Sequence, residues 1–338
     1  MTINSVGDQS RALVLRSQTT RLRERLQDLT GEMSSGITAD RAGRLSGNTV
    51  LLNHYESQIV QLTQYQQTGA EAGAIASATQ DVLSALRADA ATLRGSLLSV
   101  TPADSSGFIP LRAAEARGHF ISAVGRLNTE VAGLHLFAGQ NSDTPPLIEP
   151  EPILAELGLL TTGLTTADAV ATVISDWFDA APGAGGFLDF AYRGTIDQPR
   201  QIQISEDRSI AFTTTAATPV IRELLASLAL AAVADSAALA ASGAERLALI
   251  QRSSAALITN EAGLVDEMGR VGFLEALTER FGSENANALS VVQIGRAGLV
   301  TADPFETSTA LHEVETQLET LYTLTARLSR LKLVDYLR

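Results

Sequence analysis

The sequence contains four histidines, the residue type most often used to bind a transition metal. They are His54, His119, His135 and His312, and none lies three or four residues from another histidine, the spacing that places two imidazoles on one helical face. The chain has no cysteine, which excludes disulfides, thiolate metal sites and cysteine nucleophiles. The sequence therefore predicts neither a metal site nor a cofactor site.

Two other patterns could carry chemistry, a glycine-rich loop and pairs of carboxylates. The glycine-rich stretch 183–186 reads GAGG, but it lacks the preceding strand and downstream lysine of a phosphate-binding loop. Carboxylate pairs such as Glu313 with Glu315, or Asp179 with Asp189, are readily found in an acidic chain, and a solvated surface explains them. A glycosidase-type dyad stays open as an alternative. No catalytic residue is predicted, and we expect the chain not to be an enzyme.

Both ends of the chain carry apolar residues at alternating steps of three and four, the heptad spacing of paired helices. In the first stretch these residues are Leu15, Leu22, Leu26, Leu29 and Met33. In the last stretch they are Leu311, Val314, Leu318, Leu321 and Leu328, followed by Leu331 and Tyr336. Ser308 or Thr309 is expected to cap this last helix.

A single helix of this kind is unstable alone, because burying one apolar stripe stabilises it less than ordering its backbone costs. We expect the first and last helices to pair with each other, and then with copies from neighbouring subunits. An intramolecular antiparallel bundle closed on itself is an equally open alternative by pattern alone.

The chain between these helices divides into long helical patterns and one segment of different composition. Helical spacing runs from Leu52 to Leu97, and again from about Pro219 to about Gly298. Between 141 and 218, prolines, glycines and acids concentrate. There, strand-like alternation appears in FLDFAYRG, RQIQISED and RSIAFTTT.

The predicted fold class is therefore mainly α: an elongated antiparallel helical bundle or coiled coil of N- and C-terminal arms, with a small inserted α+β domain. The predicted segments are an N-terminal core helix (1–40), the N-terminal half of a helical rod domain (45–140), an inserted outer domain with strands (141–218), the C-terminal half of the rod domain (219–300) and a C-terminal core helix (301–338).

The formal net charge of -13 disfavours binding to nucleic acid or to anionic lipid. The first residues lack a basic region followed by an apolar run, so a cleaved secretory peptide is not expected. The most apolar stretch, from Leu224 to Ser242, is interrupted by Asp235 and is read as a buried helix that does not span a membrane. Neither nucleic acid nor membrane is a predicted partner.

Three motifs resemble the flagellin superfamily of axial proteins, and within it the hook-filament junction proteins (hook-associated protein 3). LQDLTGEMSSGITADRAGRL (26–45) resembles the family's leucine-rich helix that ends in Ser-Gly, although Asp40 stands alone where family members commonly carry an Asp-Asp pair. GLHLFAGQNSDTPPL (133–147) resembles the Leu-Phe-Ala-Gly-x-x-x-Asp-Thr-Pro-Pro segment of junction proteins. LHEVETQLETLYTLTARLSRLKLVDYL (311–337) resembles their C-terminal helix.

The resemblance implies a structural protein of the extracellular bacterial flagellum that self-assembles as a ring between hook and filament and adapts one to the other. It implies export without a cleaved signal peptide through the flagellar type III apparatus, with an export chaperone, and contacts with hook-associated protein 1 and flagellin. The assembly interface would then comprise Leu15, Leu22, Leu26, Leu29, Met33, Leu311, Val314, Leu318, Leu321, Leu328, Leu331 and Tyr336. A flagellin and, less favoured, a non-flagellar coiled-coil protein are the alternatives.

Overall fold

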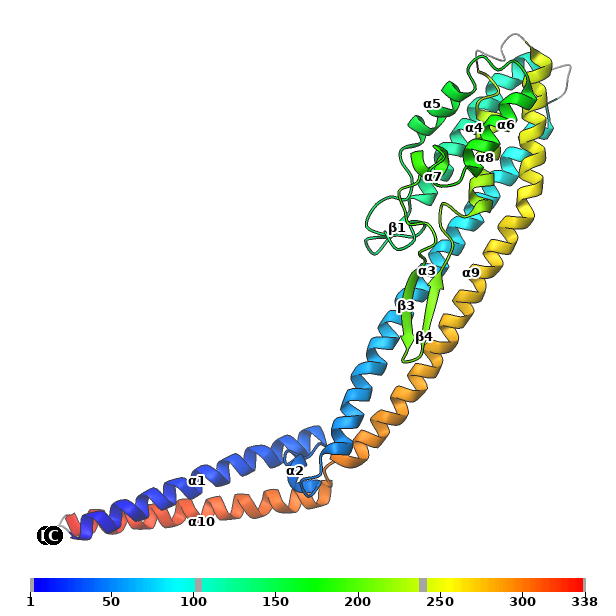
Figure 1. Ribbon diagram of the computed structural model, residues 1–338. Helices are drawn as coiled ribbons and strands as arrows, with labels where there is room; N and C mark the ends of the chain where they lie inside the picture. Colours follow the sequence, from blue (N-terminus) through cyan, green and yellow to red (C-terminus); the bar gives the residue numbers. More distant parts are fainter. Residues whose placement is uncertain (1–2, 101–104, 237–241, 337–338) are drawn as a thin grey trace. The chain divides into compact units, whose positions relative to one another are not determined.

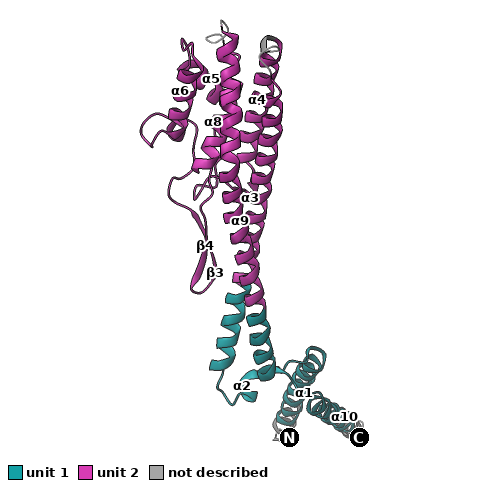
Figure 2. Cartoon of the chain, turned by 90° about the vertical axis from the view of Figure 1, so that its right-hand side faces the viewer, with its two compact units in different colours: residues 1–63, 287–338 teal, residues 64–286 magenta. Residues whose placement is uncertain are grey.

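The computed structural model describes the backbone of residues 3–100, 105–236 and 242–336, and the side chains of these residues except 3–9, 12, 105–106 and 328–336. The described chain is mainly helical, with two small antiparallel strand pairs (Figure 1). This confirms the predicted mainly α class with a small α+β portion. The chain forms two compact units, unit 1 (1–63 and 287–338) and unit 2 (64–286), which Figure 2 shows in different colours.

Unit 1 contains the two terminal helices, α1 (Ile3–Ser35) and α10 (Pro304–Tyr336), which lie side by side and antiparallel (Figure 1). It also contains the short helix α2 (Arg41–Arg44), the beginning of α3 (Val50–Leu98) and the end of α9 (Gly243–Val300). The pairing of the first and last helices within one chain is as the heptad spacing predicts.

The start of α10 differs from the prediction that Ser308 or Thr309 caps it. Asp303 is the cap: its Oδ1 accepts hydrogen bonds from the backbone N–H groups of Phe305 at 2.8 Å and Glu306 at 3.3 Å. Pro304 follows as the first helical residue, where its missing N–H costs nothing. The helix therefore begins about one turn earlier than predicted.

Unit 2 combines most of α3 and α9 with α4 (Ser105–Leu127), α5 (Pro150–Leu160), α6 (Ala167–Asp179), α7 (Phe187–Phe190) and α8 (Pro219–Ala232). Its strand pairs are β1 (Glu130–Val131) with β2 (Leu134–His135), and β3 (Arg200–Ser205) with β4 (Arg208–Phe212). In the second pair Ile202 lies opposite Ile210, and both side chains are buried.

One continuous apolar core holds unit 2 together. It joins Leu83 of α3, Phe120 of α4, Phe178 of α6, Leu225 of α8 and Leu264 of α9, all of them almost fully buried. Residues between 141 and 218 thus share their core with the long helices. Their burial within this one chain contributes hydrophobic free energy to the folding of unit 2.

Two predictions about this region are wrong. The stretch FLDFAYRG contains the helix α7, because the Asp189 carboxylate accepts hydrogen bonds from the N–H groups of Gly183 and Gly185 and closes a tight turn. The helical run expected from Pro219 to Gly298 is interrupted, because α8 ends at Ala232 and α9 begins at Gly243. Residues 237–241 of this run lie outside the described residues.

Candidate functional site

The predicted interface residues lie on the paired helices α1 and α10. Leu29, Val314 and Leu318 are buried against one another, and Leu22, Leu26 and Leu311 pack against them partly buried; we call these six residues the arm core. Leu15 and Leu321 are half-buried, whereas Met33 is 51% exposed and lies outside the arm core. Leu328, Leu331 and Tyr336 lie outside the described side chains. Contact of any of these residues with another subunit stays a prediction.

A groove runs between α1 and α10 beside the arm core. Its volume is about 480 Å³, and its lining includes Gln18, Leu22, Thr320 and Leu321. Two leucines of the predicted heptads therefore remain open to a further side chain. A groove of this kind between two antiparallel helices suits an inserted apolar residue.

A polar contact also joins the two helices, and the sequence analysis missed it. Nε and Nη2 of Arg23 donate hydrogen bonds to the hydroxyl oxygen of Tyr322, at 3.2 and 3.0 Å, and the guanidinium carbon lies 5.8 Å from the ring centroid. No sequence signal could have found this pair, because its members are 299 positions apart.

The end of α1 is tied to the α9–α10 junction by a backbone clamp, which we define as residues 36–38 and 300–302. The N–H of Thr38 donates to the carbonyl of Val300, and the N–H of Ala302 donates to the carbonyl of Gly36, both at 2.9 Å. Gly36 has a φ of +68°, in the left-handed region that ends helices. The Ser-Gly of the first motif thus stops α1 and presents Gly36 to the clamp.

A buried carboxylate supports the same clamp. Glu32 is only 8% exposed, and its Oε1 accepts hydrogen bonds from the N–H of Ala39 at 2.7 Å and from the hydroxyl of Thr38 at 3.2 Å. The lone Asp40 accepts from the N–H of Gly43 at 2.8 Å and caps α2. Glu32 at the end of α1 and Asp40 in the following loop therefore both accept from nearby backbone N–H groups.

Replacing Gly36 with alanine is expected to destabilise the clamp by about 1–2 kcal/mol, because a Cβ disfavours the left-handed conformation. The added Cβ would meet no atom within 4 Å, so the effect comes from the backbone alone. Hydrogen exchange at the Thr38 and Ala302 amides should accelerate. The matched control is Gly31→Ala within α1, where a Cβ also meets nothing within 4 Å and alanine favours the helix. Equal hydrogen-exchange rates of the Thr38 and Ala302 amides in the two variants would contradict this role of Gly36.

The second motif, residues 133–147, is an internal part of unit 2. Phe137 and Ala138 are fully buried. The carbonyl of Phe137 accepts from the N–H of Ala216 at 2.9 Å, and that of Ala138 accepts from the N–H of Thr195 at 3.0 Å. The motif thus connects the end of α4 to the segments on either side of the β3–β4 pair.

Several of the groups first considered for chemistry have local partners. Asp189 binds the amides of the GAGG loop, and these hydrogen bonds from Gly183 and Gly185 hold the pKa of its carboxyl below the usual range. His135 Nδ1 lies 3.0 Å from the carbonyl oxygen of Asn128, and Asp179 lies 3.9 Å from Arg222. Within the described residues, no three His, Asp or Glu side chains are grouped so that they could hold a metal ion.

Glu261 on α9 forms ion pairs with Arg94 and Arg87 on α3 and so links the two long helices within unit 2. A hydrogen bond from Arg94 on α3, and a second from Arg87 at 3.2 Å, hold the pKa of the Glu261 carboxyl below its ordinary value of 4.5. Because the unfolded chain takes up this proton at higher pH than the folded chain, the stabilisation is present above the ordinary pKa and is lost as the pH falls through the lowered one.

The free energy of unfolding of the native chain is therefore expected to fall more steeply than that of Glu261→Gln as the pH drops below the ordinary pKa of 4.5. Denaturant unfolding followed by the fluorescence of Trp177, the only tryptophan, measures this. The control is Glu284→Gln, which removes an exposed ion pair with Arg280 on the same helix. If the free energy of unfolding depends on pH in the same way in the native chain and in Glu261→Gln, the ion pairs of Glu261 do not stabilise the fold.

The fold of this chain has a counterpart among solved structures. A chain from Vibrio parahaemolyticus, assigned as a flagellar hook-associated protein, has a similar fold. The match has a TM-score of 0.51 at 13% sequence identity and covers 73% of this chain and 95% of that chain. At this identity the likeness concerns the fold alone. No family model and no curated protein matches the sequence.

None of the helices in the described part of the chain is both long and apolar enough to cross a lipid bilayer.

Proposed function

We propose that this protein is a structural axial component of the bacterial flagellum that assembles at the junction between hook and filament. The observation that carries the proposal is the incomplete cover of the paired helices α1 and α10. The fold likeness to a chain assigned as flagellar hook-associated supports it, as do the three motifs of the sequence.

Unit 1 buries few of its apolar side chains. Among its described residues, three side chains of the arm core are almost completely buried, and so are Leu52, Val300 and Ala302, whereas many large apolar side chains of the unit are exposed. These exposed residues are Leu13, Val14, Met33, Val50, Leu51, Val60, Val291, Ile294, Phe305, Tyr322 and Leu324. Contiguous exposed apolar surface is typical of a protein–protein interface, and Leu13 with Val14, and Val50 with Leu51, are exposed neighbours in the chain. Neighbouring subunits that cover it would stabilise the arms.

Unit 2 has the opposite character, since its core is continuous and lies within one chain. Its folding therefore needs no assembly, and its surface is free to differ from that of other axial proteins. This division suits a component whose paired terminal helices pack like those of other axial proteins, while the component itself adapts the hook to the filament.

The partners proposed on this basis are further copies of the same chain in a ring, hook-associated protein 1 on the hook side and flagellin on the filament side. Before assembly, the chain would pass through the flagellar type III export apparatus without cleavage of a signal peptide, and an export chaperone would cover its arms. Its final location would be the extracellular flagellum.

The test separates assembly from export. Leu321 lines the groove between α1 and α10, so Leu321→Asp places a charge where a neighbouring apolar residue would insert. Deletion of the last ten residues or so removes Leu331 and Tyr336, two residues of the predicted interface. Both variants should still be secreted, while filaments fail to grow beyond the hook and motility is lost.

The control is Thr323→Asp, which adds the same charge at an exposed position of α10 outside the groove lining. It should leave motility unchanged. Normal motility of Leu321→Asp would overturn the proposed role of the groove.

A further inference from the structure

The groove between α1 and α10, which we call the arm groove, is lined by two leucines and one unpaired cation. Leu22 and Leu321 are the leucines, and both are half-buried. The hydroxyls of Thr316 and Thr320, in the same lining, donate to helix carbonyls four positions earlier at 2.8 and 2.9 Å. Arg21 also lines the groove and has no ion pair with any side chain that the structure describes. The arm groove therefore suits an apolar group with a carboxylate beside it.

The start of α10 presents such a group. Phe305 is 83% exposed, the largest exposed fraction among the large apolar side chains that the structure describes. Glu306 follows it, is also exposed and forms no ion pair within the described residues. Oδ1 of Asp303 accepts from the N–H groups of both residues. The backbone that carries Phe305 is thus ordered before any contact, which lowers the entropy cost of binding.

Phe305 does not reach the arm groove of its own chain. On α10 the lining of the groove begins at Thr316, eleven positions after Phe305, which corresponds to about 17 Å at the rise of an α-helix. A phenylalanine side chain is too short to span this distance. An arm groove that holds Phe305 must therefore belong to a second copy of the chain.

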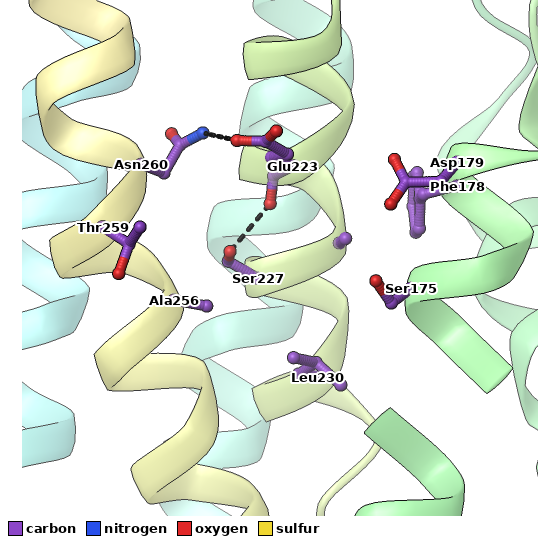
Figure 3. Close-up of a pocket in the computed structure, with 10 residues that line it drawn as sticks. Ser175, Phe178, Asp179, Glu223, Ser227, Leu230, Ala256, Thr259 and Asn260 are labelled. Atoms are coloured by element: carbon purple, nitrogen blue, oxygen red, sulfur yellow. Dashed lines mark hydrogen bonds between the residues drawn. The ribbon is translucent and has the colours of Figure 1, made fainter. Parts of the chain in front are cut away.

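The groove over α8 in unit 2, between α6 and α9, lacks this complementarity (Figure 3). Its lining carries the carboxylates of Asp179 and Glu223, and Nδ2 of Asn260 donates to the second of them at 3.3 Å. Its volume is about 270 Å³, against about 480 Å³ for the arm groove. Because its negative charges would repel Glu306, the arm groove is the better match for the start of α10.

We propose that Phe305 of one subunit inserts into the arm groove of the next subunit, where it packs against Leu22 and Leu321 while Glu306 pairs with Arg21. The contact joins two different surfaces, so each subunit gives one Phe305 and accepts another. Repeated contacts of this kind close a ring when the rotation between subunits fits. The inference rests on the proposed assembly of copies through their paired terminal helices, and it adds which part of one subunit meets which part of the next.

Photo-crosslinking in isolated flagella tests this contact. The full chain carries Phe305→p-benzoylphenylalanine, which keeps an aromatic ring at this position and bonds to neighbouring C–H groups on illumination. A covalent dimer of the chain is expected, with the crosslink mapped by mass spectrometry to residues 18–22 or 316–321 of the second copy. The matched control is Phe273→p-benzoylphenylalanine in unit 2, where the phenylalanine is also exposed; it should give no crosslink to these residues.

The outcomes separate this inference from the proposed function. A chain that is present in the flagella but whose residue 305 crosslinks to a different protein, or to another part of the second copy, overturns the contact and leaves the axial role intact. A chain that is absent from the flagella overturns both.

Exchange of the two charges tests the contact independently. Arg21→Glu should lower the yield of the crosslinked dimer about two- to fivefold, as expected for loss of a partly exposed ion pair. Adding Glu306→Arg to the same chain should restore the yield, because opposite charges then meet again. Adding Asp28→Arg instead, at an exposed acid of α1 outside the groove lining, should not restore it. Equal recovery with the two added substitutions, or recovery with neither, would contradict the pairing of Glu306 with Arg21.

Discussion

A chain carrying Leu318→Asp is expected to lose the pairing of α1 with α10 while unit 2 stays folded. Leu318 is 7% exposed and packs against Leu29 and Val314. An uncompensated charge buried there costs about 3–5 kcal/mol, which exceeds what so small an apolar cluster can offset. Hydrogen exchange along α1 and α10 should rise strongly, and the Trp177 fluorescence of unit 2 should remain native.

The control for this variant is Leu324→Asp on the same helix, because Leu324 is already 45% exposed. It should leave the protection of α1 unchanged. If α1 keeps its protection in Leu318→Asp as well, the arm core does not hold the two helices together.

Phe137→Ala is expected to destabilise unit 2 by about 3–5 kcal/mol, the usual cost of removing a buried aromatic side chain. Phe137 lies in the first half of the second motif, is fully buried and joins the core of unit 2. Denaturant unfolding followed by Trp177 fluorescence should show a lower midpoint with an unchanged slope.

The same substitution at Phe305 provides the comparison, since this residue is 83% exposed. Phe305→Ala should change the free energy of unfolding by no more than about 0.5 kcal/mol. A small effect of Phe137→Ala would contradict a role of this motif in the core of unit 2.

The helical part of the fold could be predicted from the sequence because its signals are local and repeated. The heptads that contain Leu29 and Leu318 have the period of paired helices, and the structure buries both residues in one cluster. The β3–β4 pair could also be predicted, since Ile202 and Ile204 alternate with polar residues and are buried. In both cases the spacing of side chains and the period of the backbone agree.

Other features could not be predicted, because contacts between distant residues decide them. The stretch that contains Phe187 alternates like a strand, but Asp189 binds the preceding loop and forces a helical turn. The clamp between Gly36 and Ala302 joins backbone groups 266 positions apart, and backbone groups carry no sequence signal. The hydrogen bond from Nδ2 of Asn260 to the carbonyl of Val220 likewise forms only once α8 and α9 are packed together.

Electron microscopy of isolated hook-basal bodies with attached filaments, labelled with antibody against unit 2, tests the central claim most directly. The proposed role predicts a single labelled band at the boundary between hook and filament. Label spread along the whole filament would identify a filament subunit instead, and label absent from the structure would contradict an axial role altogether.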